Sequence, residues 1–271
     1  MSESIKINIP SIIFASLLEI SFLFIFSYYN IKYYLGKKYI ILIGCAGFFC
    51  SVFIEGVLLS LLAKIFGDSA YIITPLSLLF PGLFEETGRY LCYKFFLANE
   101  TNKLTAISYG VGHGGFESFL LGFAFLRFIF AKDALVNQGF LKEDVTFMYC
   151  FLGVIERIAA IYLQMSLSVL VYKSFKEKDI RWFILAIILH DFVDLFAIIY
   201  RKDLIKNMFV IELIICLFSF FISRYAYKIY INLDNITKEE VIQQNFPLKD
   251  KKENEQNNID QINDNSSEKI E

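Results

Sequence analysis

Ionisable residues inside apolar sequence are the feature of this chain most able to do chemistry. Glu85, Glu86 and Arg89 lie between two hydrophobic runs, residues 75–84 and 90–97. Charged groups in a membrane span are costly, and they usually face a bundle interior or a wet cavity where they have a function. On a helix, Arg89 can reach either acid but cannot neutralise both fully. If Arg89 pairs with Glu86, then Glu85 is left as a carboxylate able to take a proton from water, as a general base does.

The two histidines of the chain each precede a carboxylate by one helical turn. Tyr109, His113 and Glu117 are spaced four residues apart and would form one stripe along a helix. His190 and Asp194 repeat that spacing. Each histidine is either a hydrogen-bonded core residue or a metal ligand whose carboxylate orients it or ligates beside it. Because the histidines are far apart in the sequence, this is not the His-Glu-x-x-His helix of zincins, and a shared site must form between helices.

Other charges in apolar sequence are weaker candidates. Glu156 and Arg157 are adjacent and most simply form an ion pair. The remaining acids in apolar sequence, Glu19, Glu55 and Glu212, stand alone at depths that the sequence does not fix, and Glu55 is the one we most expect to line a cavity. The group at Glu85 also has a simpler interpretation, in which an ion pair joins two helices and one acid is protonated.

The composition indicates a multi-span membrane protein. Of 271 residues, 56% are hydrophobic, 17% aromatic and only 20% charged, which is too apolar for an ordinary soluble domain. The net charge is −2, and many acids lie near the C-terminus, so no nucleic-acid-binding surface is expected. The five cysteines are scattered through apolar sequence without a Cys-x-x-Cys pair, which favours buried reduced thiols over disulfides or a thiolate zinc site.

The fold predicted is all-α, a polytopic membrane helical bundle with about seven transmembrane helices. A bilayer span needs about 20 apolar residues, and the stretches that qualify are residues 11–30, 39–65, 71–98, 104–130, 147–172, 181–200 and 207–230. The fourth is rich in glycine, which lets neighbouring backbones approach closely. The bundle would occupy residues 1–231, and a polar disordered tail would follow over residues 232–271.

Loop cations predict how the protein sits in the cell membrane. Lys and Arg number 11 near the loops of one side and 6 near those of the other. Because cytoplasmic loops carry the excess of positive charge, the N-terminus is expected outside and the C-terminus in the cytoplasm. The first residues lack a basic segment and an evident cleavage site, so the first apolar run is expected to be a retained span.

With these residues in place, the chain resembles the YhfC family of intramembrane metalloproteases, within the wider grouping of CAAX prenyl endopeptidases and PrsW-type proteases. The resemblance covers about residues 10–230. It is carried by Glu-Glu-x-x-Arg at 85–89, by an aromatic-x-x-x-His run that continues to Glu117, and by His-x-x-x-Asp at 190–194. Glu156-Arg157 with the segment 168–171 also looks like a family segment. The order of these motifs, each in a separate apolar stretch, makes the set more specific than any one motif.

The resemblance implies an endopeptidase acting on a membrane protein or peptide in or near the lipid bilayer. Glu85 would activate water for attack on a peptide carbonyl, and Glu86 and Arg89 would hold and tune it. His113 would bind the same water or a metal, and His190 with Asp194 would supply the other face of the site. The implied ligand set for a zinc ion is His113, Glu117, His190 and Asp194, although a metal-free mechanism stays open.

Two departures and two alternatives bear on this reading. Asp194 stands where CAAX endopeptidases often carry asparagine, which favours a ligand or orienting role, and nothing indicates a preference for prenylated substrates. Tyr109 and Glu156 are weaker candidates for substrate contact. A non-enzymatic carrier or metal-binding membrane protein would use the same buried charges, as would a scaffold that has lost activity. An internal repeat typical of transporters is not evident.

Overall fold

The computed structural model of this chain describes residues 5–67, 70–137, 144–202, 204–205 and 207–233. Within these ranges the chain is helical, with one isolated bridge between Ile7 and Val145. The all-α prediction is therefore confirmed. The predicted polar tail lies, from residue 234 onward, outside the described residues. The helices are α1 (Ile9–Tyr34), α2 (Lys38–Phe66), α3 (Ala70–Phe95), α4 (Leu104–Phe130), α5 (Lys132–Asn137), α6 (Phe147–Glu177), α7 (Ile180–Arg201) and α8 (Met208–Asn232).

The long helices coincide with the predicted spans to within a few residues, and the short α5 is an additional helix. By length and apolar composition, α1, α2, α6, α7 and α8 can cross a membrane. Large apolar side chains are exposed along their outer faces, for example Phe14, Phe53 and Phe221. An apolar surface of this extent suits lipid rather than water. The helices α3 and α4 are not among these five.

Four of the long helices begin at a polar side chain that accepts a hydrogen bond from the first turn. Asn8, Thr146, Asp179 and Asn207 cap α1, α6, α7 and α8 in this way. Such caps satisfy backbone N–H groups that have no partner within the helix. The apolar runs therefore end where the sequence supplies a capping residue.

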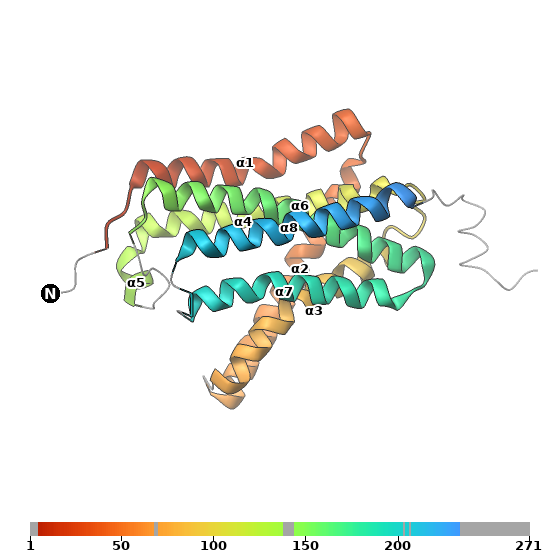
Figure 1. Cartoon of the computed structure of the whole chain (residues 1–271). Coiled ribbons are helices and arrows are strands. Elements are labelled where there is room, and N and C mark those ends of the chain that lie inside the picture. Colours follow the sequence, from red (N-terminus) through yellow and green to blue (C-terminus); the bar gives the residue numbers. More distant parts are fainter. Residues whose placement is uncertain (1–4, 68–69, 138–143, 203, 206, 234–271) are drawn as a thin grey trace, which may run out of the picture.

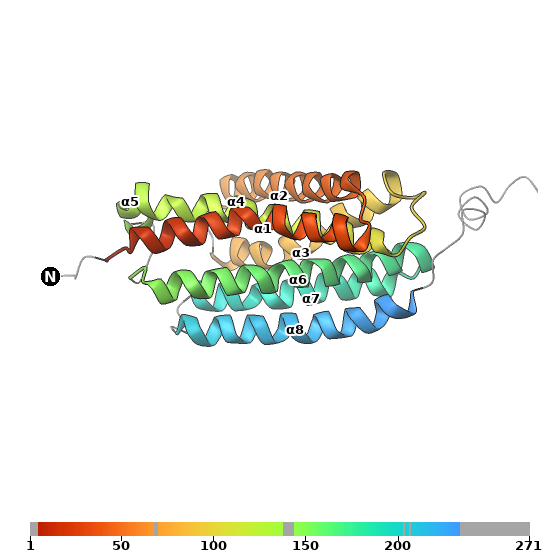
Figure 2. The same cartoon turned by 90° about the horizontal axis from the view of Figure 1, so that it is seen from above.

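The helix α4 lies in the middle of the bundle, packed against α1, α2 and α6. The helix α6 also contacts α7 and α8, and α3 contacts α2 and α7. Figures 1 and 2 show most of the helices running alongside one another, whereas the far end of the α2–α3 pair leans away from the others. The start of α1 and the end of α8 lie at opposite ends of the bundle (Figure 1). The interior where α3, α4, α6 and α7 come together holds the polar residues.

Glycines of α4 allow the close packing of its neighbours, as the sequence predicted. A Cβ atom added at Gly112 would overlap the carbonyl group of Ile41 on α2. One added at Gly110 would lie 2.5 Å from the Cα of Met165 on α6. Both contacts are to backbone atoms, which cannot move aside without moving a helix. The small residues therefore set the spacing of α2, α4 and α6.

We expect Gly112→Ala to destabilise the bundle, because the added methyl group must push α2 away from α4. Overpacking of this kind costs about 1–3 kcal/mol. Thermal unfolding in detergent, followed by circular dichroism, would measure the loss. The matched control is Gly56→Ala on α2, where an added Cβ meets nothing within 4 Å. If both substitutions left the unfolding temperature unchanged, the close contact between α2 and α4 would be wrong.

Candidate active site

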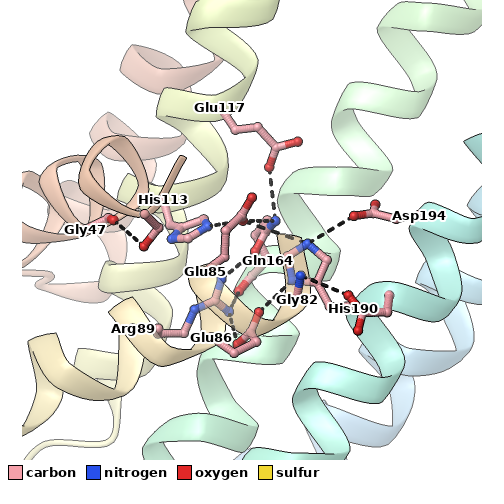
Figure 3. A network of polar contacts seen from close by, with 12 residues as sticks. Gly47, Gly82, Glu85, Glu86, Arg89, His113, Glu117, Gln164, His190 and Asp194 are labelled. Atoms are coloured by element: carbon pink, nitrogen blue, oxygen red, sulfur yellow. Dashed lines mark hydrogen bonds and ion pairs between the residues drawn. The ribbon is translucent and has the colours of Figure 1, made fainter. Parts of the chain in front are cut away.

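Buried polar residues from four helices meet inside the bundle (Figure 3). The helix α3 supplies Glu85, Glu86 and Arg89, and α4 supplies His113. The helix α7 supplies His190. Glu86, Arg89 and His113 are fully buried, and Glu85 and His190 are 7% and 3% exposed. Ionisable groups this deeply buried need partners or a function.

Glu85 lies between the two imidazole rings (Figure 3). Its Oε2 atom is 2.8 Å from Nε2 of His113 and 3.8 Å from Nε2 of His190. The ring of Phe48 packs edge-on against His113, with 5.0 Å between the centroids. The Nε2 atoms of His113 and His190 thus both lie near Oε2 of Glu85, although the three residues belong to three separate helices. In this structure the three motifs form one site.

Glu86 and Arg89 lie next to these residues, and Glu86 contacts both His190 and Arg89. Oε1 of Glu86 is 2.8 Å from Nδ1 of His190, and its Oε2 is 3.4 Å from Nη1 of Arg89. Arg89 therefore pairs with Glu86 rather than Glu85, the arrangement that leaves Glu85 without an arginine partner. The contact to Nδ1 also turns Nε2 of His190 toward Glu85.

Gln164 of α6 is the residue that sequence reasoning missed. Its side-chain oxygen accepts a hydrogen bond from Nη2 of Arg89 at 2.5 Å, and its backbone carbonyl accepts one from Nη1 at 3.1 Å. Its Nε2 donates to Glu117 at 3.0 Å and lies 3.5 Å from Oε2 of Glu85. The available signal was a single amide within an apolar span, since such side chains often bond between helices.

The carboxylates of α7 lie on different sides of that helix. Oδ2 of Asp194 is 3.7 Å from Nε2 of His190, on the side of the site. Asp191 instead accepts a hydrogen bond from the backbone N–H of Gly82 at 2.9 Å, which joins α7 to α3. The expected one-turn pairing of His190 with Asp194 is present, and Asp191 faces elsewhere.

The remaining sequence candidates lie around this centre. Glu117 accepts a hydrogen bond from Nη1 of Arg157 at 2.9 Å, and Arg157 also pairs with Glu156. Glu156 thus forms the ion pair that was its simplest reading. Tyr109 is fully buried, with its ring 6.0 Å from that of His113 and 5.9 Å from the guanidinium of Arg89. The substrate-contact roles of Tyr109 and Glu156 stay predictions.

The two imidazole nitrogens and the carboxylate oxygen that meet at Glu85 are groups that can bind a metal ion. The distances between them are those of hydrogen bonds and ion pairs. A histidine that ligates through Nε2 usually has its Nδ1 held by a carboxylate, and Glu86 holds His190 in this way. His113 also presents Nε2, and its buried Nδ1 has no hydrogen-bond partner among the residues that the structure describes. Over the described ranges, no group of three or more His, Cys, Asp or Glu side chains is arranged as a metal site. Glu117 was expected to be a metal ligand, but its carboxylate already bonds to Arg157 and Gln164.

Comparison with known proteins identifies the family. A sequence profile of the YhfC intramembrane metalloprotease family matches residues 15–215. The chain belongs to the YhfC family. The matched range contains every residue of the site described above. The YhfC resemblance inferred from the three motifs is therefore confirmed.

A curated YhfC relative is also similar. It is the uncharacterized membrane protein YhfC of Bacillus subtilis (strain 168), 30% identical over 160 residues. The match covers 52% of this chain and 62% of the relative, which is less than two thirds of that protein. Together with the apolar helices, it supports a membrane location. No solved structure matches this chain.

Proposed function

We propose that this protein is an intramembrane endopeptidase that hydrolyses a peptide bond of a membrane protein or membrane peptide. The observation that carries the proposal is the meeting of Glu85, His113 and His190, from three helices, around one buried carboxylate oxygen. A carboxylate and two imidazoles suit water activation and stabilisation of a charged intermediate. The name of the YhfC family supports the same reaction class.

In this mechanism Glu85 is the general base. Oε2 of Glu85 takes a proton from a water molecule, whose oxygen attacks the carbonyl carbon of the scissile peptide bond. When the C–N bond breaks, the protonated Glu85 returns the proton to the leaving amine. His113 holds the carboxylate of Glu85 by its Nε2, which lies at hydrogen-bonding distance from it. One carboxylate thus serves both proton transfers, as general acid–base catalysis requires.

His190 can act in either of two protonation states, and its contact with Glu86 orients the ring in both. If the ring is neutral and donates from Nδ1 to Glu86, Nε2 carries a lone pair directed toward Glu85. If the ring is protonated, Nε2 becomes a donor that can stabilise the oxyanion of the intermediate. Asp194, beside Nε2, would balance that positive charge.

The zinc ion that the family name implies would be held by His113 and His190, with Asp194 as a further ligand. Such an ion, when bound, lowers the pKa of bound water and polarises a carbonyl group. The proton transfers assigned to Glu85 are unchanged by this addition. The positioning roles of Glu86, Arg89 and Gln164 are also unchanged.

We expect the protein, purified in detergent without chelators, to contain about one zinc ion per chain. Elemental mass spectrometry would measure it. The zinc content should fall in His113→Ala and in His190→Ala, because each removes one ligand, while circular dichroism shows the helices retained. The control is Glu177→Gln, which changes an exposed carboxylate at the end of α6. Zinc equal to wild type in both histidine variants would contradict this ligand assignment.

We further propose that all the long helices, α3 and α4 included, cross the bilayer. The start of α1 would lie outside the cell and the end of α8 in the cytoplasm. The loop cations support this orientation. The opposite positions of those two ends in the bundle are consistent with an odd number of crossings.

The peptidase proposal can be tested without a known substrate. The purified protein is reconstituted into liposomes that contain a detergent-extracted bacterial membrane proteome. New peptide N-termini are then identified by mass spectrometry against liposomes without the protein. We expect a limited set of new termini within or near membrane spans. An unchanged set of termini would contradict the proposal.

A further inference from the structure

A pocket with charged residues in its lining lies near the proposed active site, toward the end of the bundle where α1 begins. Its volume is about 490 Å³. It is enclosed by α1, α4, α6, α7 and α8, and its charged lining consists of Glu19, Glu156, Glu212, Arg157 and Arg127. Arg127 is exposed, whereas the other four lie further inside. The pocket is thus mainly acidic in its inner part.

Within the described part of the chain, two of its carboxylates, those of Glu19 and Glu212, lie near the positive charge of Arg157. Glu19 is only 4% exposed. Its Oε1 lies against Gly153, another residue of the pocket lining. Oε2 of Glu212 is buried and has no hydrogen-bond partner within the described ranges. Buried carboxylates are unfavourable and call for a cationic partner or a proton.

Arg157 attracts both carboxylates, but the N–H groups of its guanidinium are already bonded to other residues. Its Nε and Nη2 atoms bond to the two oxygens of Glu156, and its Nη1 bonds to Glu117 at 2.9 Å. A bidentate pair of this kind fixes the orientation of the guanidinium. The carboxylates of Glu19 and Glu212 therefore remain available to a ligand.

The pocket is connected to the active site by a short chain of polar contacts. Arg157 contacts Glu117, and Glu117 accepts a hydrogen bond from Nε2 of Gln164 at 3.0 Å. The same nitrogen lies 3.5 Å from Oε2 of Glu85. Arg157 and Gln164 are two turns apart on α6, a rise of about 10 Å at 1.5 Å per residue. A side chain close to the scissile bond could span that distance.

We propose that this pocket binds the cationic side chain of a lysine or arginine near the scissile bond of the substrate, with Glu19 and Glu212 as its partners. Its identification as a substrate subsite rests on the proposed peptidase function. The binding of a cation does not require catalysis. A metal ion is a poorer fit, because the described residues contain no metal-type cluster. The pocket volume suits an organic group.

The binding can be measured with benzamidine, an amidinium cation, against benzamide, its neutral analogue. Saturation-transfer NMR on the purified protein in detergent should detect benzamidine and not benzamide. We expect Glu19→Gln and Glu212→Gln each to weaken benzamidine binding at least about tenfold, since each removes a charge-assisted hydrogen bond. Glu177→Gln should bind as wild type. The proposal would be overturned if benzamide bound as tightly as benzamidine. It would also be overturned if benzamidine bound to both pocket variants as tightly as to the wild type.

The role in substrate choice has a separate readout. Among the new peptide termini made by the wild-type protein, lysine or arginine should be enriched within a few residues of the cut. The double variant Glu19→Gln/Glu212→Gln should lose those cuts selectively. If benzamidine binds but no termini appear, the pocket stands as a cation site and the peptidase function fails. If termini appear without basic residues near them, the subsite proposal fails and the peptidase function stands.

Discussion

Glu85→Gln is expected to stop peptide cleavage while leaving the fold intact. A glutamine has nearly the same shape and can still hydrogen-bond to His113, but it cannot accept a proton from water at neutral pH. General acid–base groups contribute about 10²–10⁴-fold to hydrolysis rates, and here one group serves both proton transfers. The rate of appearance of new peptide termini in liposomes would show a loss of that size.

Glu177→Gln is the matched control for Glu85→Gln. That residue is exposed and pairs with Lys173 near the end of α6, away from the site. The Glu177→Gln variant should cleave peptides at the wild-type rate. The helix content and unfolding temperature of Glu85→Gln should also match those of the wild type. Cleavage by Glu85→Gln at more than about a tenth of the wild-type rate would remove Glu85 from the role of general base.

Arg89→Met is expected to cause the largest loss of stability among single substitutions at the site. Arg89 is fully buried, and it contacts Glu86 and both the backbone and side chain of Gln164. Removing it leaves the carboxylate of Glu86 buried without a positive partner other than His190. Breaking a buried ion pair on one side costs about 3–5 kcal/mol. Thermal unfolding in detergent would measure the change.

A double substitution separates the loss of charge balance from the loss of packing. If the unpaired carboxylate causes the effect, Glu86→Gln combined with Arg89→Met should recover part of the stability lost in Arg89→Met alone. Replacing both members of a buried pair by neutral groups is often close to neutral. Wild-type stability in Arg89→Met would contradict the buried pair. A double variant no more stable than Arg89→Met would assign the loss to packing.

The residues of the site could be found from the sequence because they violate the pattern around them. Glu85, Glu86, Arg89 and the two histidines are ionisable residues in apolar stretches, and the hydrocarbon core of a membrane tolerates few of these without a function. The one-turn spacing of His190 and Asp194 also predicted their pairing, since helix geometry alone brings such residues together. Local periodicity was sufficient for both inferences.

Gln164 and the carboxylates Glu19 and Glu212 show where that reasoning ends. Each lies in an apolar stretch, and its partner in the structure cannot be inferred from its neighbours in the sequence. Gln164 acquires its importance because α6 packs beside α3 and α4, so one amide reaches Arg89, Glu117 and Glu85. The acidic pocket likewise forms only where α1, α6 and α8 converge.

By itself, the sequence determined that this is a helical membrane protein, which stretches are its helices and which ionisable residues are candidates for its chemistry. These properties depend on composition and on spacing within one helix, and both are local. Only the tertiary structure decided that Arg89 pairs with Glu86 and that Glu85 lies between His113 and His190. The physical reason is that these contacts join residues of different helices or select between two partners on the same helix. Helix packing, set in part by the glycines of α4, makes that choice.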